Sequence, residues 1–94
     1  MDDIDQSGWG NSPHQRAFGA AVRELRARRG LSQEGLGLRG GLHRNYVGAV
    51  ERGEINPTLR VILKLCKGLG LPMTEFACTY ERQLADDYAA SPTV

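Results

Sequence analysis

The sequence is poor in residues that support catalysis, metal binding or disulfide bonding. It has two cysteines and two histidines in 94 residues. Cys66 and Cys78 lack the CxxC or Cys/His spacing of a metal site, and we expect reduced thiols in the core or in an interface. His14 and His43 have no carboxylate or nucleophile partner in a catalytic pattern. The sequence therefore predicts no enzyme, no cofactor and no small-molecule ligand.

Long apolar runs and strand patterns are also absent. No run approaches the roughly 18–20 apolar residues that a membrane span requires. The segment 1–5 is acidic and has no signal-peptide pattern, so we expect an intracellular, cytoplasmic protein that does not contact a membrane. A glycine-rich phosphate loop follows a strand, and no segment of the sequence has a convincing strand pattern. The sequence therefore indicates no such loop. These absences favour an all-α fold.

The periodicity of apolar residues and the capping residues predict five helices in one small domain. They are expected at about 14–29, 32–39, 43–52, 58–69 and 72–88. Two segments, 1–13 and 89–94, are predicted to be disordered tails. The first of these segments contains Trp9. A domain of this size has a modest core, and such domains are often stabilised by dimerisation.

The charge of the chain is unevenly distributed, although the net charge is only +1. Residues 14–70 contain eleven basic and four acidic side chains, a net charge of +7. The remaining residues contain one basic and seven acidic side chains, a net charge of −6. A local positive excess of this kind suits a partner that carries phosphate groups.

The predicted helix at 43–52 has two different faces. At about 100° per residue, one face is small, polar and cationic and the opposite face is apolar. The first face holds Arg44, Asn45, Gly48, Ala49 and Arg52, and the second holds Tyr46, Val47 and Val50. Long charged side chains are usual on a solvated helix face, which is the alternative interpretation. Small residues here predict close approach to a large partner.

The polar residues on that face match the chemistry of base edges. Arg44 can pair with guanine O6 and N7, and Asn45 can pair with adenine N6 and N7. In the segment before it, Ser32 is a good N-cap and Gln33 is placed to bond a phosphate. Gly40-Gly41 supplies a tight turn between the two helices. This pattern predicts two helices that bind the major groove of double-stranded DNA.

Residues 17–76 resemble the lambda-repressor-like helix-turn-helix family, also called the XRE or Cro/repressor family. The resemblance rests on four motifs in the usual order, which are Arg26-Ala27-Arg28-Arg29-Gly30-Leu31-Ser32-Gln33-Glu34, Leu42-His43-Arg44-Asn45-Tyr46-Val47, Val50-Glu51-Arg52-Gly53 and Asn56-Pro57-Thr58-Leu59. Within the family, the chain looks most like restriction–modification controller proteins. The resemblance implies a bacterial DNA-binding domain over 14–88, with a dimerisation helix at about 72–88.

The resemblance also implies roles for single residues. Base contacts would come from Arg44, Asn45, Gly48 and Ala49. Phosphate contacts would come from Ser32, Gln33, His43 and Arg52. Arg26 and Glu51 would form a semi-buried ion pair between the first helix and the recognition helix.

The chain departs from the family pattern at three glycines in or beside the second helix, Gly35, Gly37 and Gly40. Each interior glycine costs roughly 0.5–1 kcal/mol relative to alanine. We therefore expect this helix to be the least stable of the domain. Close packing of Gly37 against the recognition helix would offset part of that loss.

The last helix carries an apolar stripe at spacings of three or four residues. It consists of Met73, Phe76, Ala77, Tyr80, Leu84 and Tyr88. Phe76 is expected to complete the core of the domain, and Phe76, Tyr80, Leu84 and Tyr88 are predicted at a homodimer interface. Packing of the stripe within its own chain is the alternative.

These observations predict a transcriptional regulator that binds a palindromic operator as a homodimer. The centres of the two half-sites would lie about 34–36 Å apart, which is one turn of DNA. One alternative is an antitoxin that binds both a toxin protein and its own promoter. Another is a phage-type repressor, which usually has a larger oligomerisation region.

Overall fold

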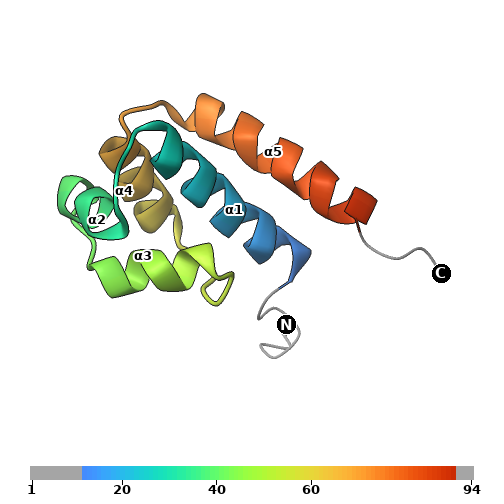
Figure 1. Cartoon of the computed structure of the whole chain (residues 1–94), viewed down its shortest axis with the longest axis horizontal. Helices are drawn as coiled ribbons and strands as arrows, with labels where there is room; N and C mark the ends of the chain where they lie inside the picture. Colours follow the sequence, from blue (N-terminus) through green and yellow to red (C-terminus); the bar gives the residue numbers. More distant parts are fainter. Residues whose placement is uncertain (1–11, 91–94) are drawn as a thin grey trace.

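The computed structural model describes residues 12–90, which form five α-helices and no strand (Figure 1). The helices are α1 (Pro13–Arg28), α2 (Gln33–Gly40), α3 (Arg44–Glu51), α4 (Leu59–Leu69) and α5 (Met73–Ala90). The all-α fold with five helices is therefore confirmed. The predicted bounds differ from these by at most two residues at any end.

Capping residues set most of the helix ends. The hydroxyls of Ser12, Ser32 and Thr58 each accept a hydrogen bond from a backbone N–H in the first turn of α1, α2 and α4. Gly41 and Gly70 follow α2 and α4 in the left-handed conformation, with φ of 77° and 71°, which glycine adopts without steric cost.

The ends of the chain were predicted less well than its middle. Ser12 and Pro13 were expected in the N-terminal tail, but Ser12 caps α1 and Pro13 begins it. Proline suits the first turn because its fixed φ is helical and no N–H partner is needed there. At the other end, α5 continues to Ala90, two residues beyond the prediction. Trp9 and the remaining tail residues, 1–11 and 91–94, lie outside the described residues.

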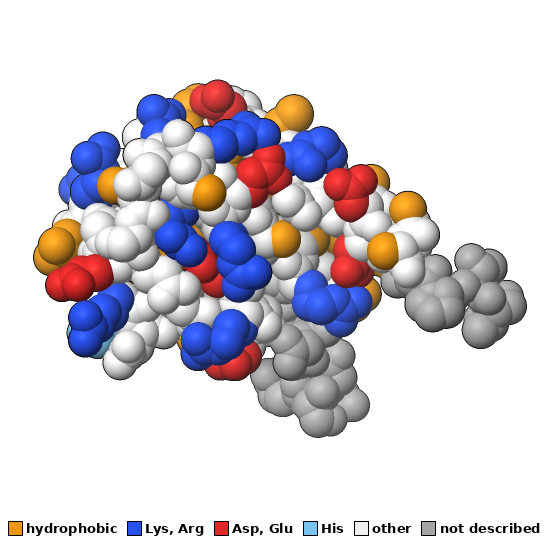
Figure 2. All heavy atoms as spheres, viewed as in Figure 1, with side chains coloured by type: hydrophobic (Ala, Val, Ile, Leu, Met, Phe, Trp, Pro, Cys, Tyr) orange, Lys and Arg blue, Asp and Glu red, His pale blue; other side chains and the backbone are white. Residues whose placement is uncertain are grey.

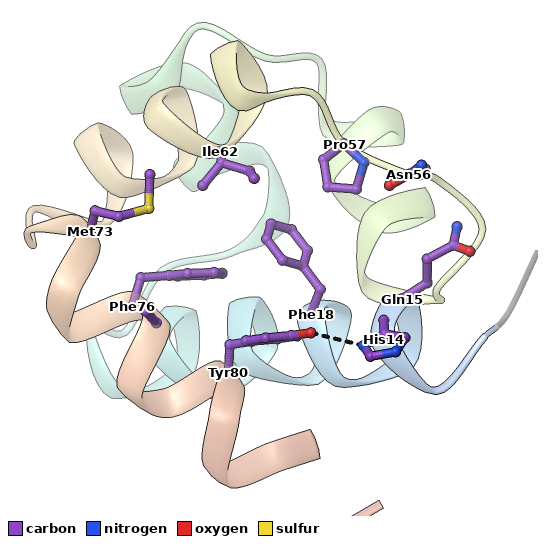
Figure 3. Close-up of a pocket in the computed structure, with 10 residues that line it drawn as sticks. His14, Gln15, Phe18, Asn56, Pro57, Ile62, Met73, Phe76 and Tyr80 are labelled. Atoms are coloured by element: carbon purple, nitrogen blue, oxygen red, sulfur yellow. Dashed lines mark hydrogen bonds between the residues drawn. The ribbon is translucent and has the colours of Figure 1, made fainter. Parts of the chain in front are cut away.

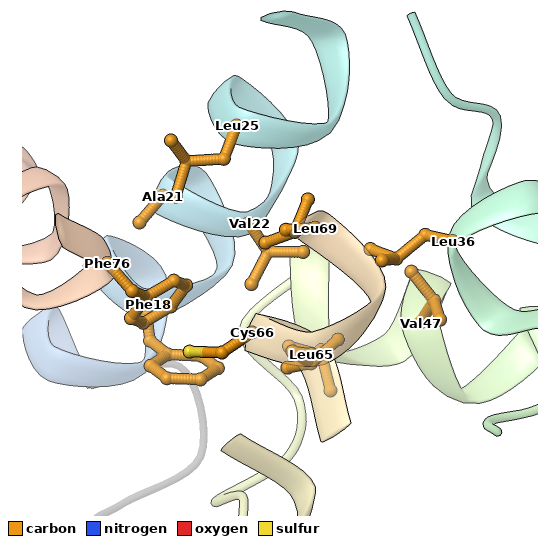
Figure 4. Packing of buried hydrophobic residues seen from close by; sticks show 11 residues of the cluster. Phe18, Ala21, Val22, Leu25, Leu36, Val47, Leu65, Cys66, Leu69 and Phe76 are labelled. Atoms are coloured by element: carbon orange, nitrogen blue, oxygen red, sulfur yellow. The ribbon is translucent and has the colours of Figure 1, made fainter. Parts of the chain in front are cut away.

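The hydrophobic core draws side chains from all five helices (Figure 4). Its largest fully buried members are Val22 of α1, Leu36 of α2, Val47 and Val50 of α3, and Leu65 and Leu69 of α4. Phe18 and Phe76 join α1 to α5, with ring centroids 5.0 Å apart. The core holds α2 and α3 on one side of the molecule and α5 on the other (Figure 1).

Helix α5 lies antiparallel to α1 along much of its length (Figure 1). Arg16 near the start of α1 pairs with Asp87 near the end of α5 at 3.1 Å. Further along α1, Glu24 pairs with Arg82 and accepts a hydrogen bond of 2.6 Å from Gln83. The hydrogen bond from Arg82 holds the pKa of Glu24 below its usual value, although burial acts in the opposite direction. Polar contacts therefore attach α5 to α1 beyond the aromatic core.

The two cysteines occupy different environments. Cys66 is buried in the core, where burial raises the pKa of its thiol, and Cys78 is exposed on α5. Among residues 12–90, no three His, Cys, Asp or Glu side chains are grouped to hold a metal ion. None of the five described helices is both long enough and apolar enough to cross a membrane.

Candidate nucleic-acid interface

Helices α2 and α3 are joined by a tight turn in which the backbones touch. The N–H of Leu42 donates to the carbonyl of Gly37 at 2.8 Å. A Cβ atom at Gly37 would lie 2.3 Å from the carbonyl oxygen of Leu42, and one at Gly40 would lie 2.6 Å from that of Lys64 in α4. Only glycine allows these approaches. The close packing predicted at Gly37 is present, but its nearest neighbour is Leu42 in the turn before α3 rather than α3 itself, and Gly40 has a similar role against α4.

The N-terminal turn of α3 presents Arg44 and Asn45 to the surface. Both residues are exposed, whereas Val47 and Val50 on the opposite face are buried. His43 caps the helix, because its Nδ1 accepts the N–H of Asn45 at 3.0 Å. A ring that accepts at Nδ1 carries its proton on Nε2 when it is neutral, so Nε2–H remains a donor. This turn therefore has several donors beside one another at the helix N-terminus.

Gly48 does not form part of an open surface, contrary to the sequence prediction. It is buried because the side chains of Gln33 and Arg52 cover it. A Cβ atom there would lie 3.1 Å from Nη1 of Arg52 and 3.3 Å from Oε1 of Gln33. Ala49 is half-buried. A base contact at Gly48 would require these two side chains to move.

A buried polar cluster fixes α3 to α1 and α2. The side chain of Glu51 is 0% exposed and accepts hydrogen bonds from Arg26 at 2.7 and 3.0 Å, so the expected ion pair is present. Gln33 Nε2 donates to the same carboxylate at 3.0 Å, and Arg23 lies 3.5 Å away. Burial raises the pKa of Glu51, but these bonds and charges outweigh burial and hold that pKa below its usual value.

The cluster also determines how the first turn of α2 can meet DNA. One amide hydrogen of Gln33 is used by Glu51, which leaves the second for a phosphate. The Ser32 hydroxyl accepts the N–H of Gly35 at 2.9 Å and keeps its own hydrogen as a donor. The phosphate roles of Ser32, Gln33 and His43 stay predictions, and these bonds are compatible with them.

The two arginines that flank α3 are paired with carboxylates. Arg44 lies 3.3 Å from Glu34, and Arg52 lies 2.8 Å from Glu54. The hydrogen bond between Arg52 and Glu54 raises the pKa of Arg52 and lowers the pKa of Glu54. Sequence reasoning missed both pairs. The pair of Arg52 and Glu54 could have been found from their spacing of two residues, but Glu34 meets Arg44 only through the turn.

Lys and Arg side chains are spread over the visible face of the molecule and are not confined to the side that carries α2 and α3 (Figure 2). Figure 2 shows Lys and Arg side chains over α2 and α3, with acidic side chains among them. Phosphate groups of DNA are attracted to such a surface at long range.

The four residues predicted at a dimer interface differ in their burial. Phe76 is 3% exposed and belongs to the core, so its assignment to the interface is wrong. Tyr80 is half-buried, and its hydroxyl lies 3.1 Å from His14 Nδ1 (Figure 3). Leu84 is half-buried and Tyr88 is exposed. The beginning of the stripe packs within the chain, and its end does not.

A sequence model of a helix-turn-helix family matches residues 22–76, more than half of the chain. The chain belongs to this family. The predicted resemblance is thereby confirmed, and α2 and α3 are the helix-turn-helix pair.

Relatives of this helix-turn-helix protein include restriction–modification controllers. The controller C.AhdI from Aeromonas hydrophila has 46% sequence identity, a TM-score of 0.67, and coverage of 69% of this chain and 98% of that one. The control protein C.SmaI of Serratia marcescens is 50% identical over 48 residues, which are 51% of this chain and 57% of that protein. An uncharacterised helix-turn-helix transcriptional regulator of Bacillus subtilis is 46% identical over 54 residues, which are 57% of this chain and 82% of that regulator.

The fold is also that of the controller C.Esp1396I, whose tetramer has been solved with its natural 35-base-pair operator. That structure has a TM-score of 0.75 and covers 79% of this chain and 97% of its own. Its sequence identity of 23% supports likeness of fold alone. The relatives are regulators or controllers by name, which agrees with the prediction that the chain is not an enzyme.

Proposed function

We propose that the chain regulates transcription by binding a palindromic operator as a homodimer, and that it controls a restriction–modification system. The N-terminal turn of α3, with Arg44 and Asn45 exposed above a buried cluster, carries the proposal. A rigid helix that presents these two side chains can enter the major groove and pair with guanine and adenine. Because DNA would be its ligand, the protein would act in the cytoplasm.

Each part of the interface has a separate task in this mechanism. Arg44 and Asn45 would meet base edges, and Ala49 one turn later would contact a thymine methyl group. Ser32, Gln33, His43 and Arg52 would contact phosphates and set the register of α3. The bonds among Arg26, Gln33 and Glu51 would hold α2 and α3 at a fixed angle, so one rigid surface meets both backbone and bases.

Selection of bound duplexes from a random pool, at physiological salt, tests this function. The expected result is a palindrome in which the centres of the two half-sites lie about one turn of DNA apart, 10–10.5 base pairs. Weak binding that depends on salt without any enriched sequence would contradict it. That result would favour the antitoxin, although the relatives named as controllers favour the operator-binding protein.

A further inference from the structure

Arg23 of α1 carries a positive charge beside the helix-turn-helix pair. Its side chain is 59% exposed, and its Nε lies 3.5 Å from Oε1 of Glu51 in α3. Each of the other three arginines of α1 donates a hydrogen bond to a carboxylate. The side chain of Arg23 makes no hydrogen bond to an acceptor among residues 12–90, so its guanidinium donors are available to a ligand. Sequence reasoning counted Arg23 only in the net charge of residues 14–70.

The ion cluster around Glu51 has an excess of positive charge. Arg26 donates two hydrogen bonds to the Glu51 carboxylate, at 2.7 and 3.0 Å, and a third to the carbonyl of Leu31 at 2.8 Å. Arg23 is the more exposed of the two arginines near this carboxylate, at 59% against 18%. Two guanidinium groups beside one carboxylate leave one positive charge uncompensated. A phosphate group would neutralise that charge.

Arg23 lies close to Gln33, the first residue of α2, which is predicted to contact a phosphate. Nε2 of Gln33 donates to Oε1 of Glu51 at 3.0 Å, and Nε of Arg23 approaches that same oxygen atom. The sum of these two distances is therefore the largest separation that the two nitrogens can have. Hydrogen bonds of about 2.9 Å to two oxygens of one phosphate can bridge such a separation. A phosphate bound by Gln33 would thus lie within reach of Arg23.

We propose that Arg23 and Gln33 bind the same phosphate of the DNA backbone, and that Glu51 between them positions both side chains. This inference rests on the proposed function, and it adds α1 to the helices that contact DNA. The guanidinium of Arg23 would donate to one phosphate oxygen, and the second amide hydrogen of Gln33 would donate to another. Because neither side chain contacts a base, their effect on affinity should be the same for every DNA sequence.

The alternative is that Arg23 serves only to stabilise the buried Glu51 carboxylate. Burial raises the pKa of Glu51, the hydrogen bonds from Arg26 and Gln33 lower it, and the charge of Arg23 lowers it least. An exposed guanidinium at 3.5 Å, without a hydrogen bond, contributes little to the stability of a fold. The position of Arg23 therefore favours binding of a ligand over a purely structural role.

The salt dependence of DNA binding tests the contact of Arg23. The slope of log affinity against log salt concentration changes by about 0.9 for each phosphate that loses its cationic partner. Arg23→Gln should therefore make the slope shallower by about 0.9 per protein chain bound, and it should weaken binding to the selected operator and to a scrambled duplex by the same factor, about three- to tenfold. Arg23→Lys retains the charge and should restore the slope. Arg23→Met, which is also uncharged, serves if Arg23→Gln does not fold.

Arg28→Gln is the matched control for the loss of one positive charge. Arg28 lies on the same helix and is 61% exposed, but it pairs with Glu24, which also pairs with Arg82 of α5. Its charge therefore lies on the α5 side of α1, away from Glu51. Arg28→Gln should leave the slope close to that of the wild type. An equal change of slope in the two variants would mean that only the net charge matters, and it would overturn the proposal.

Operator duplexes that carry one uncharged methylphosphonate at a time locate the phosphate itself. The wild type should lose affinity at one position in each half-site, and at that position neither Arg23→Gln nor Gln33→Ala should lose more. Different positions for the two variants, or a wild-type salt slope in folded Arg23→Gln, would overturn the proposal. A wild type that selects no operator would refute the proposed function instead, and the salt slope on the scrambled duplex would still decide whether Arg23 contacts a phosphate.

Discussion

Arg44 and Arg52, the two cations at the ends of α3, each lie beside a carboxylate in the protein without DNA. A phosphate or a guanine that binds these arginines would compete with Glu34 for Arg44 and with Glu54 for Arg52. The acids would therefore compete with every phosphate, but a correctly placed guanine offers Arg44 two acceptors in return. At the scale of single residues, these acids would reduce nonspecific binding more than specific binding.

Glu34→Gln should raise the affinity for random DNA about two- to fivefold, since an exposed ion pair contributes about 0.2–1 kcal/mol. Fluorescence anisotropy with a scrambled duplex, at several salt concentrations, measures the change. Glu75→Gln is the matched control, because it changes the net charge by the same amount at an exposed residue of α5. Equal effects of the two substitutions would mean that only net charge matters.

Arg44→Ala and Gln33→Ala should weaken DNA binding in different ways. Loss of a guanine contact should cost roughly 1–3 kcal/mol and relax the preference at one base pair in each half-site. Loss of a phosphate contact should weaken binding to all sequences about equally. Affinities for a panel of single-base operator variants distinguish these patterns. An Arg44→Ala protein that retains the full preference would show that Arg44 does not contact that base.

Arg26→Ala should be among the most destabilising single substitutions outside the apolar core. It leaves the fully buried Glu51 carboxylate without its main partner, and such losses cost about 3–5 kcal/mol. Urea unfolding of the variant and the wild type measures the change in the free energy of unfolding. Arg23→Ala is the control, because Arg23 is largely exposed and lies farther from Glu51, at 3.5 Å. A similar loss of stability in both variants would contradict a specific role for the Arg26 pair.

The same carboxylate should make stability depend on pH in the acid range. The pKa of Glu51 is lower in the folded protein than in the unfolded chain, so its contribution is fully present above its unfolded pKa. That contribution is lost as pH falls through the folded pKa. Urea unfolding at successive pH values below 7 should show a shallower decline for Glu51→Gln than for the wild type. Parallel declines would exclude Glu51 as a source of the acid sensitivity.

At the scale of elements, the two glycines in the middle and at the end of α2 are contact sites. Gly37→Ala should destabilise the protein by about 1–3 kcal/mol, because its Cβ would meet the backbone of Leu42. Gly35→Ala is the control in the same helix, where the added Cβ would meet only side chains, at 3.2 Å or more. Gly35→Ala should leave the stability of the protein unchanged or raise it by up to about 1 kcal/mol, because alanine has the higher helix propensity. Thermal unfolding of both variants compares them, and equal losses would contradict the close approach at Gly37.

Local signals in the sequence predicted the elements well. Ser32, Thr58 and Gly70 mark helix ends by their own chemistry, so the bounds were accurate to one or two residues. The covering of Gly48 could not be predicted in this way, because it depends on side chains from α2 and from the end of α3. The burial of Phe76 likewise depends on the packing of α5 against α1. Contacts between elements, rather than within them, account for these errors.

At the scale of the whole molecule, the proposed DNA interface and the predicted dimerisation residues lie on different elements. Helices α1, α2 and α3 carry the residues proposed to contact DNA, and α5 carries Leu84 and Tyr88. The stretch with a net charge of +7 includes the DNA-binding helices, so affinity should fall steeply as salt is added. Dimerisation and operator binding would be linked, because a monomer engages only one half-site.

Interference by guanine N7 methylation on the selected operator tests the central claim most directly, since it probes the major-groove atom that Arg44 is proposed to contact. The account predicts that methylation at two symmetry-related guanines, about one turn apart, prevents binding of the wild type. The same modification should not impair Arg44→Ala further. Binding that is insensitive to N7 methylation at every guanine, or equal sensitivity of the two proteins, would contradict base reading by Arg44 at the start of α3.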